Sequence, residues 1–335
     1  MPSGPAGGRA QPIRVEECFL TLNPLDLLGQ LPGSIAQGLI WGIMAIGVYI
    51  TYKILNIADL TVDGSFCTGG AVCVVMLLQG YDSSIALLFA FLAGLITGLV
   101  TGFFHTFCGI SAILAGILTQ LGLWSVNLAI MGKANQAINV DKYPLLVSLR
   151  YLQEVLKGTR PFFWSPILIV SLFVLLIIAL LYWFFGTELG SSVRATGANL
   201  RMARAQGINT NKNTVLGIML SNGLVALSGG LLAQYQGFAD INMGRGAIVI
   251  GLASVIIGEV LFAKLFRNFA LRMLGVVIGA IVYYMVIQTV LWLKLDANYL
   301  KLLSALVVAV FLAIPYWKGK CFASSLSRKG GSGHA

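Results

Sequence analysis

Charged side chains are scarce in this sequence. Asp, Glu, Lys and Arg make up only 10% of its 335 residues, whereas soluble domains are about one-quarter charged. Hydrophobic residues make up 58% of the chain, and several uncharged runs reach the roughly 20 residues that a helix needs to cross a bilayer. The composition therefore excludes an ordinary soluble protein. It predicts an all-α, polytopic transmembrane helical bundle, and the 39 glycines suit closely packed membrane helices.

Signatures of catalysis and of metal binding are also absent. The sequence has no GxxxxGKS/T, HExxH or GxSxG motif. Cys67, Cys73 and Cys108 fall inside apolar runs, and Cys18 and Cys321 lie near opposite ends, so no disulfide framework or zinc site is expected. We expect no enzyme activity, no catalytic residue, no metal, no cofactor bound by this chain and no nucleic-acid partner. If ATP powers the protein, another chain binds the ATP and Mg²⁺.

Apolar runs bounded by polar residues, Gly or Pro predict nine spans, with an error of one. The spans are 33–52, 64–80, 84–105, 110–131, 165–185, 213–236, 246–263, 273–292 and 301–317. Residues 1–32 are predicted to be an extension at the membrane surface or flexible, without a cleavable signal peptide. Residues 33–317 form the transmembrane domain, with a cytoplasmic loop at 186–212. Residues 318–335 form a basic cytoplasmic tail that ends in an expected expression remnant.

Two basic loops predict the orientation, because short cytoplasmic loops are rich in Lys and Arg. The 186–212 loop has four basic residues, and no Asp or Glu occurs between positions 189 and 239. The 264–272 loop has three basic residues. Two spans separate these loops, so both can be cytoplasmic, and counting back places the N-terminus outside. The five basic residues of the 132–164 segment argue against this topology, and the count assumes that the second span crosses fully.

An inverted repeat is suggested by two similar segments. "GISAILAGILT" from Gly109 and "GRGAIVIGLAS" from Gly244 share Gly, Ala, Ile and Gly at the same offsets. The predicted topology runs them in opposite directions, as in transporters built from repeated halves. Short matches of this composition also arise by chance between membrane helices.

A polar stretch between the first two predicted spans could carry chemistry. In "LNIADLTVDGSFCTGG", Asn56, Asp59, Thr61 and Asp63 precede an apolar run. A helix that starts inside the protein directs its free N–H groups at a polar ligand or a carboxylate. Irregular backbone is tolerated at membrane depth where it lines a cavity or is buried. The stretch is either a capping and packing element or, with a discontinuous second span, part of a translocation pathway.

Ser111 repeats the pattern after Gly109, where it is placed to cap a helix. The alternative is an ordinary tight turn on the cytoplasmic side. We include Ser111 with the four residues above as a pathway candidate. Glu259 is expected to pair with the nearby Lys264 at the cytoplasmic boundary, and no convincing carboxylate for a proton-driven mechanism is found in mid-membrane.

A short basic helix is predicted inside the 186–212 loop. Asn199 can cap it and Gly207 can end it, which leaves about two turns. Arg201 and Arg204 are three residues apart and share a face. Such a helix could anchor the loop to anionic lipid headgroups. Alternatively, it could insert into a groove on an acidic cytoplasmic partner.

Three segments of the chain resemble those of a known family. "RATGANLRMARAQGINTNKNTVLGIMLSNGLVALSGGLLAQYQG" is similar to the cytoplasmic loop and following helix of permease subunits of bacterial ABC importers, of the branched-chain amino acid and ribose type. "LNIADLTVDGS" resembles the early polar loop of that family, particularly in a subgroup associated with aromatic amino acids. With "HTFCGISAILAGILT", the resemblance covers residues 34–317.

The resemblance implies a coupling helix that fits a cleft of a cytoplasmic ATPase. The residues that correspond to it are Ala198, Asn199, Leu200, Arg201, Met202, Ala203, Arg204 and Gly207. It further implies a homodimer of permeases in the bacterial cytoplasmic membrane, two ABC ATPase chains and an extracytoplasmic binding protein. The substrate is expected to be an amino acid, and the subgroup favours an aromatic one, with nucleosides and sugars as alternatives. A secondary transporter driven by an ion gradient is the alternative from another class.

Overall fold

The computed structural model describes residues 24–140, 142–156, 161, 165–262 and 268–292, and single positions between 302 and 313. The predicted tail, 318–335, lies outside these residues, as do most of the predicted ninth span and most of the predicted 1–32 extension. Lys264, the expected partner of Glu259, also lies outside them.

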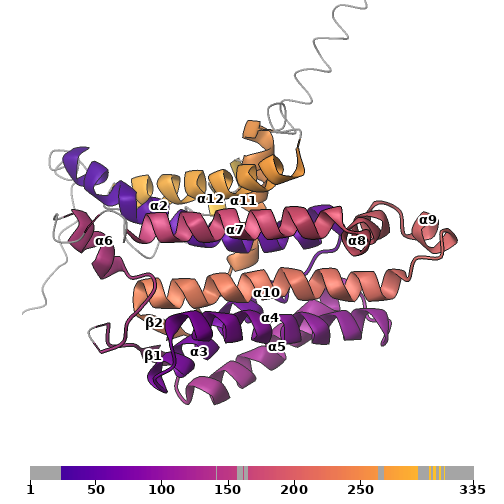
Figure 1. Ribbon diagram of the computed structural model, residues 1–335, viewed down its shortest axis with the longest axis horizontal. Coiled ribbons are helices and arrows are strands. Elements are labelled where there is room, and N and C mark those ends of the chain that lie inside the picture. The colour runs from indigo at the N-terminus through magenta and orange to yellow at the C-terminus, as the bar shows by residue number, and fades with distance from the viewer. Residues whose placement is uncertain are drawn as a thin grey trace, which may run out of the picture.

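The described chain is mostly helical (Figure 1). Its elements are α2 (Pro24–Tyr49), the π-helix η1 (Ile50–Ile54), α3 (Val62–Leu78), α4 (Ser83–Thr106), α5 (Ala112–Met131), β1 (Asn135–Ala137), α6 (Leu149–Leu156), α7 (Pro166–Gly186), α8 (Glu188–Ala198), α9 (Leu200–Ala205), α10 (Thr210–Gln236), β2 (Phe238–Asp240), α11 (Ala247–Phe262) and α12 (Phe269–Trp292). The two strands pair antiparallel, with Gln136 opposite Ala239. The strands and α6 lie at one end of the long helices, and α8 and α9 lie at the other.

Six helices among the described residues are long and apolar enough to cross a membrane. Two shorter apolar helices, α3 and α11, accompany them. These eight helices coincide with the first eight predicted spans, while the count of nine stays a prediction. The first span was predicted too short, because α2 already begins at Pro24 and continues through Pro32.

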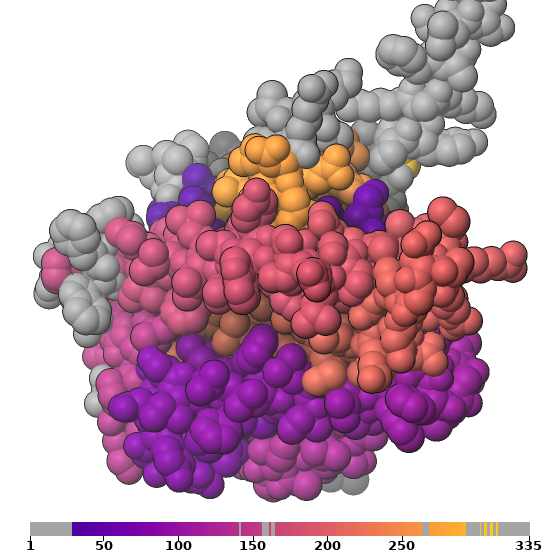
Figure 2. All heavy atoms as spheres, turned by 45° about the vertical axis from the view of Figure 1, so that its right-hand side comes forward, coloured from indigo at the N-terminus to yellow at the C-terminus, as the bar shows by residue number. Residues whose placement is uncertain are grey.

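Large apolar side chains point outward from α4, α5 and α7, as expected where lipid is the solvent. They include Leu88, Phe89, Ile96, Ile117, Leu121, Leu172, Leu176 and Trp183, all of which are exposed. Figure 2 shows α7 in rose and the α4 and α5 region in purple to magenta on the visible face. In contrast, α2 and α10 are mostly buried and form the centre of the bundle.

Helices α2 and α10 run antiparallel through this centre. The hydroxyls of Ser221 and Ser228 on α10 donate to the carbonyl oxygens of Gly47 and Ile40 on α2, each at 2.7 Å. Residue numbers rise from Ser221 to Ser228 along α10 while those of the bonded residues fall from Gly47 to Ile40 along α2, so the two helices are antiparallel. The hydroxyls therefore connect the two central helices, and each hydroxyl finds an acceptor in the dry interior.

The same packing occurs on both sides of the central pair. Helix α10 lies against α3 and α4, and α2 lies against α11 and α12. In each set the short helix precedes a long one, and the two central helices run in opposite directions. The segments predicted to be repeated, from Gly109 and from Gly244, do not occupy equivalent places. The segment from Gly109 leads into α5, and the segment from Gly244 leads into α11. By its packing against the central pair, however, α11 corresponds to α3 and not to α5. The short Gly/Ala/Ile match therefore reflects helix composition rather than position.

Glycines allow the helices to approach closely at their crossings. A Cβ at Gly69 on α3 would lie 1.8 Å from the Ala226 carbonyl oxygen on α10. A Cβ at Gly229 on α10 would lie 1.9 Å from the Phe66 carbonyl oxygen on α3. Backbone meets backbone at both points, so neither contact can be relieved by turning a side chain.

Gly69→Ala should therefore destabilise the protein by about 1–3 kcal/mol or more, as expected for overpacking of a tight core. Gly122→Ala on α5 is the matched control, because nothing lies within 4 Å of the added carbon. The control should be neutral or slightly stabilising, since Ala favours helix over Gly by about 1 kcal/mol. Thermal unfolding of both variants in the same detergent tests the expectation, which fails if the two melting temperatures are equal.

Candidate functional site

A non-helical segment reaches the middle of the bundle. After η1 the chain turns at Asn56, which has a left-handed backbone with φ of 55°, and residues 57–61 then lead to the start of α3. Asp59 in this segment is 3% exposed and contacts Asn222, which lies near the middle of α10. Such backbone is tolerated at this depth because protein surrounds it.

Asp59 is the centre of a hydrogen-bond network. Its Oδ2 atom accepts a bond from Asn222 Nδ2 at 2.7 Å, and its Oδ1 atom accepts one from the backbone N–H of Thr61 at 2.9 Å. Ser65 donates to Asn222 Oδ1 at 2.6 Å and lies 2.8 Å from the hydroxyl of Thr97. These bonds connect the segment before α3 with α3, α4 and α10.

Thr61 adds a second contact to α4, because its hydroxyl lies 2.7 Å from that of Thr101. All members of the network are buried. A buried carboxylate is costly unless polar partners satisfy it, and here donors reach both of its oxygens. Two predicted pathway residues, Asp59 and Thr61, thus lie in a satisfied network inside one chain. Its partners on α4 and α10 were not predicted.

Asp63 lies at the start of α3 and reaches the start of α11. Its carboxylate oxygens accept bonds from the backbone N–H groups of Gly246 and Ile248, each at 3.0 Å. The first N–H groups of a helix lack partners within the helix and carry partial positive charge, so a carboxylate stabilises them. The starts of the two short helices therefore meet at Asp63, in the middle of the bundle.

The remaining predicted pathway residues, Asn56 and Ser111, lie elsewhere. Both are exposed, in the turns before α3 and α5 at the α8–α9 end of the bundle. Ser111 occupies the N-cap position of α5, as predicted, but its side chain accepts no capping hydrogen bond. The structure thus brings Asp59, Thr61 and Asp63 close together and leaves Asn56 and Ser111 apart from them.

The basic loop forms two helices rather than one. Ala198 ends α8, and the extended backbone of Asn199 separates α8 from α9. The Asn199 side chain accepts bonds from the N–H groups of Arg201 and Met202, which is the predicted cap. Gly207 follows α9 with φ of 79°, as expected for the predicted end.

Helix α9 protrudes at its end of the molecule (Figure 1). Leu200 is 45% exposed and Met202 is 62% exposed, while Ala203 is buried against the chain. The Arg201 side chain is exposed and makes no hydrogen bond or ion pair within the described part of the chain. Apolar and basic groups are therefore both available to a partner on this surface.

Arg204 has a different environment from Arg201. Its Nε atom donates to Thr210 Oγ1 at 2.8 Å, and its Nη2 atom donates to Asn211 Oδ1 at 3.4 Å. These bonds join α9 to the first turn of α10. Arg204 thus helps to hold the α9–α10 connection, although its side chain remains exposed.

Helix α8 is firmly attached to the bundle. A Cβ at Gly197 would lie 1.8 Å from the carbonyl oxygen of Ile54, the last residue of η1. Asn213 on α10 donates to the hydroxyls of Ser192 and Thr196 on α8, at 3.1 and 3.2 Å. A displacement of α9 would therefore be carried by α8 to both η1 and α10.

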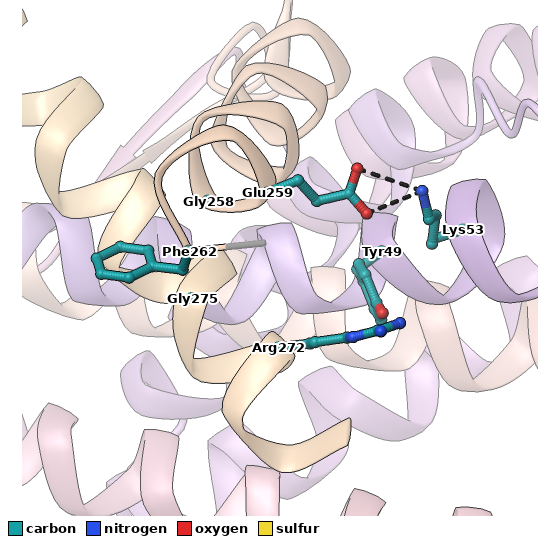
Figure 3. Close-up of a pocket in the computed structure, with 7 residues that line it drawn as sticks. All are labelled: Tyr49, Lys53, Gly258, Glu259, Phe262, Arg272 and Gly275. Carbon is teal, nitrogen blue, oxygen red and sulfur yellow. Dashed lines mark hydrogen bonds and ion pairs between the residues drawn. The ribbon is translucent and has the colours of Figure 1, made fainter. Parts of the chain in front are cut away.

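A pocket with charged walls lies beside η1 (Figure 3). Its volume is about 260 Å³, and Lys53 and Glu259 form an ion pair of 2.9 Å across it. Arg272 and Tyr49 lie close together on another wall. Among the described residues Glu259 pairs with Lys53, which is 206 positions away along the chain. The pairing with Lys264 stays a prediction, because Lys264 lies outside them. Only the fold brings Lys53 and Glu259 together.

The described helices form a bundle in which two short helices meet at the half-buried carboxylate of Asp63, with a basic helix at one end. This arrangement is that of a polytopic membrane permease. The chain belongs to the family described as "Branched-chain amino acid transport system / permease component", whose sequence profile matches residues 31–314. It is thus the permease component of an ABC-type transport system and a multi-pass protein of the bacterial inner membrane. The resemblance noted in the sequence is confirmed.

Characterised and uncharacterised relatives cover most of the chain. It is 40% identical to the tyrosine transport system permease protein of Clostridioides difficile over 83% of this chain and 88% of the relative. It is 36% identical to an uncharacterised protein of Rickettsia prowazekii, over 84% and 95% of the two chains. An autoinducer 2 import system permease protein of Yersinia pseudotuberculosis is 28% identical over 82% and 73%. No solved structure is significantly similar.

Asn222→Leu should destabilise the protein strongly, by at least about 2 kcal/mol, because it leaves a buried carboxylate and a buried hydroxyl short of partners. Ser254→Ala is the control, since that buried hydroxyl bonds only within its own helix. Adding Asp59→Asn to Asn222→Leu should recover part of the loss, because an unpaired amide costs less than an unpaired charge. Thermal unfolding measures these three variants and Asp59→Asn alone, and purely additive effects of the two substitutions would exclude a coupling between Asp59 and Asn222.

Proposed function

We propose that this chain forms the translocation pathway of an ATP-driven importer and that α9 is its coupling helix. Membership of the permease family and the exposed apolar and basic surface of α9 support the proposal. The ATP and Mg²⁺ would be bound by cytoplasmic ATPase chains. The α8–α9 end then faces the cytoplasm, as the basic residues of the 186–212 loop predict.

The attachment of α8 explains how ATPase motion could reach the pathway. Closure of the ATPase dimer would displace α9, and the close contact at Gly197 would transmit the displacement to η1. From η1 the chain continues directly to Asp59, while Asn222 lies on α10, which follows α9. Both partners of the central hydrogen bond are therefore connected to the coupling helix, and its displacement could alternate access.

The two sets of helices around α2 and α10 favour an inverted repeat with alternating access. Short helices that start at mid-depth are typical of substrate sites at the interface of such repeats. We propose that two copies form a homodimer around the pathway. An extracytoplasmic binding protein would deliver substrate at the β1–β2 end. Strand β1 and helix α6, which belong to the 132–164 segment, lie at that end and could contact it.

An aromatic amino acid is the proposed substrate. The tyrosine transport relative covers most of this chain at 40% identity, which supports the aromatic subgroup. The autoinducer 2 import relative, at 28% identity, shows that permeases similar to this chain serve other solutes, so other small polar solutes stay alternatives. Nucleosides and sugars belong among them. Uptake of labelled L-tyrosine, a nucleoside and a pentose by the same cells separates these substrates.

A carrier driven by an ion gradient is the second candidate, and one observation favours it. No convincing carboxylate for a proton-driven mechanism was expected in mid-membrane, yet Asp59 and Asp63 both lie in the middle of the bundle. Intramembrane carboxylates are typical of ion-driven transporters. Uptake that persists after ATP depletion, with the ion gradients clamped, would favour this candidate.

Arg201→Glu should abolish coupling without loss of folding, because Arg201 has no partner within the described chain and is available to an ATPase. Arg201→Glu combined with Arg204→Glu should have the stronger effect but also removes the bonds from Arg204 to α10. The measurements are co-purification with the ATPase and substrate-dependent uptake, which should fall by at least about tenfold, equivalent to about 1.4 kcal/mol.

Lys212→Glu is the matched control, since Lys212 is an exposed basic residue of the same loop beyond α9. It should leave uptake close to that of wild type. Equal loss in the Arg201 and Lys212 variants would indicate attraction to anionic lipid rather than specific docking. Wild-type uptake in the double variant would rule out α9 as the coupling helix.

A further inference from the structure

A cavity opens beside the point where the two short helices meet. Its volume is about 250 Å³, and its walls come from the first turn of α3, the second half of α5 and the segment between β2 and α11. Sites for drug-sized ligands measure about 300–1,000 Å³, so this space suits a smaller solute. Asp63 forms part of the wall and is already bonded to the start of α11.

Arg245 supplies positive charge to this cavity. It immediately precedes Gly246, whose N–H group bonds to Asp63, so its backbone lies near the middle of the bundle. The Arg245 side chain is exposed and makes no hydrogen bond or ion pair within the described ranges. An arginine facing hydrocarbon at this depth is costly, and arginines there line water-filled cavities or bind counter-ions. The cavity wall thus contains a guanidinium that is free for an anion.

Asn127 supplies an unused hydrogen-bond acceptor. This cavity-lining side chain on α5 is 1% exposed, and its Nδ2 atom donates to the Gly64 carbonyl oxygen at 3.4 Å. Its Oδ1 atom has no partner within the described residues. Buried polar atoms in folded proteins are rarely left unpaired, so an atom of this kind at a cavity wall indicates a missing donor.

The other walls combine polar and aromatic groups. Gln120 and Trp124 on α5 line the cavity with Asp63 and Arg245. Trp124 provides an apolar face of the kind on which another ring packs. Gln120 can donate or accept a hydrogen bond. One cavity therefore offers a cationic group, a carboxylate, an unpaired carbonyl oxygen and an aromatic surface.

We propose that this cavity is the mid-membrane substrate site and that it holds an α-amino acid with an aromatic or other apolar side chain. Arg245 binds the substrate carboxylate, and the Asp63 carboxylate with Asn127 Oδ1 accepts from its ammonium group. The side chain of the substrate packs on Trp124. This inference rests on the proposed transport function and adds to it the site and the pair of charges that are recognised.

The test is direct binding of tritiated L-tyrosine to the full chain in lipid nanodiscs, without a binding protein. Arg245→Gln should weaken binding by about 10- to 100-fold, as expected for loss of a charge-assisted hydrogen bond. Arg245→Lys should weaken it less, because the charge is kept. Lys133→Gln is the matched control, since Lys133 is an exposed basic residue just past the end of α5 and outside the cavity.

Competition on the wild-type chain gives an independent readout if a variant fails to fold. Tyramine lacks the carboxylate and 3-(4-hydroxyphenyl)propionate lacks the ammonium group, so each should compete at least about tenfold more weakly than L-phenylalanine. Equal competition by either compound would overturn the inference. So would unchanged binding in folded Arg245→Gln, or no binding to wild type at millimolar L-tyrosine. Uptake of L-tyrosine by cells tests the proposed transport function independently of this binding site.

Discussion

The hydrogen bond between the Asp59 carboxylate and the Asn222 amide allows a non-helical segment to lie in the centre of a membrane protein. Backbone that leaves the helical form at this depth must be surrounded by protein, and a buried carboxylate needs donors. Asn222 on α10 and the N–H group of Thr61 provide those donors. Because the segment is held there, α3 begins at mid-depth, and Asp63 can reach the start of α11. The proposed substrate cavity lies beside this junction.

Close glycine contacts make the bundle a good transmitter of motion. At Gly69 and Gly229 the backbones of α3 and α10 touch, and at Gly197 that of α8 touches the end of η1. Densely packed helices move as rigid bodies and do not deform gradually. Motion imposed on α9 would thus reach both partners of the Asp59–Asn222 bond. The Lys53–Glu259 ion pair adds a contact between η1 and α11. Its side chains are 47% and 38% exposed, so solvent weakens the pair and it can break.

Local signals in the sequence were sufficient for the parts of the structure that depend on neighbours along the chain. The first eight spans coincide with helices, although α2 starts earlier than predicted. Asn199 caps α9 and a left-handed Gly207 follows it, since capping needs only residues a few positions apart. The partners of Asp59 and Glu259 could not be found this way. Asn222 lies 163 positions from Asp59, and no periodicity reports such a distance.

The sequence by itself determined that this is a helical membrane protein, where its helices lie, and which loop is basic, because these features follow from composition and short-range pattern. The motifs of the 186–212 loop and of the early polar stretch also indicated its family. Only the tertiary structure decided which polar residues meet. It placed Asp59 and Thr61 in a satisfied network, left Asn56 and Ser111 at the surface, and put Asn127 and Arg245 beside Asp63. The physical reason is that membrane helices share one apolar composition, so their neighbours are selected by glycine contacts and buried hydrogen bonds between residues far apart in the chain.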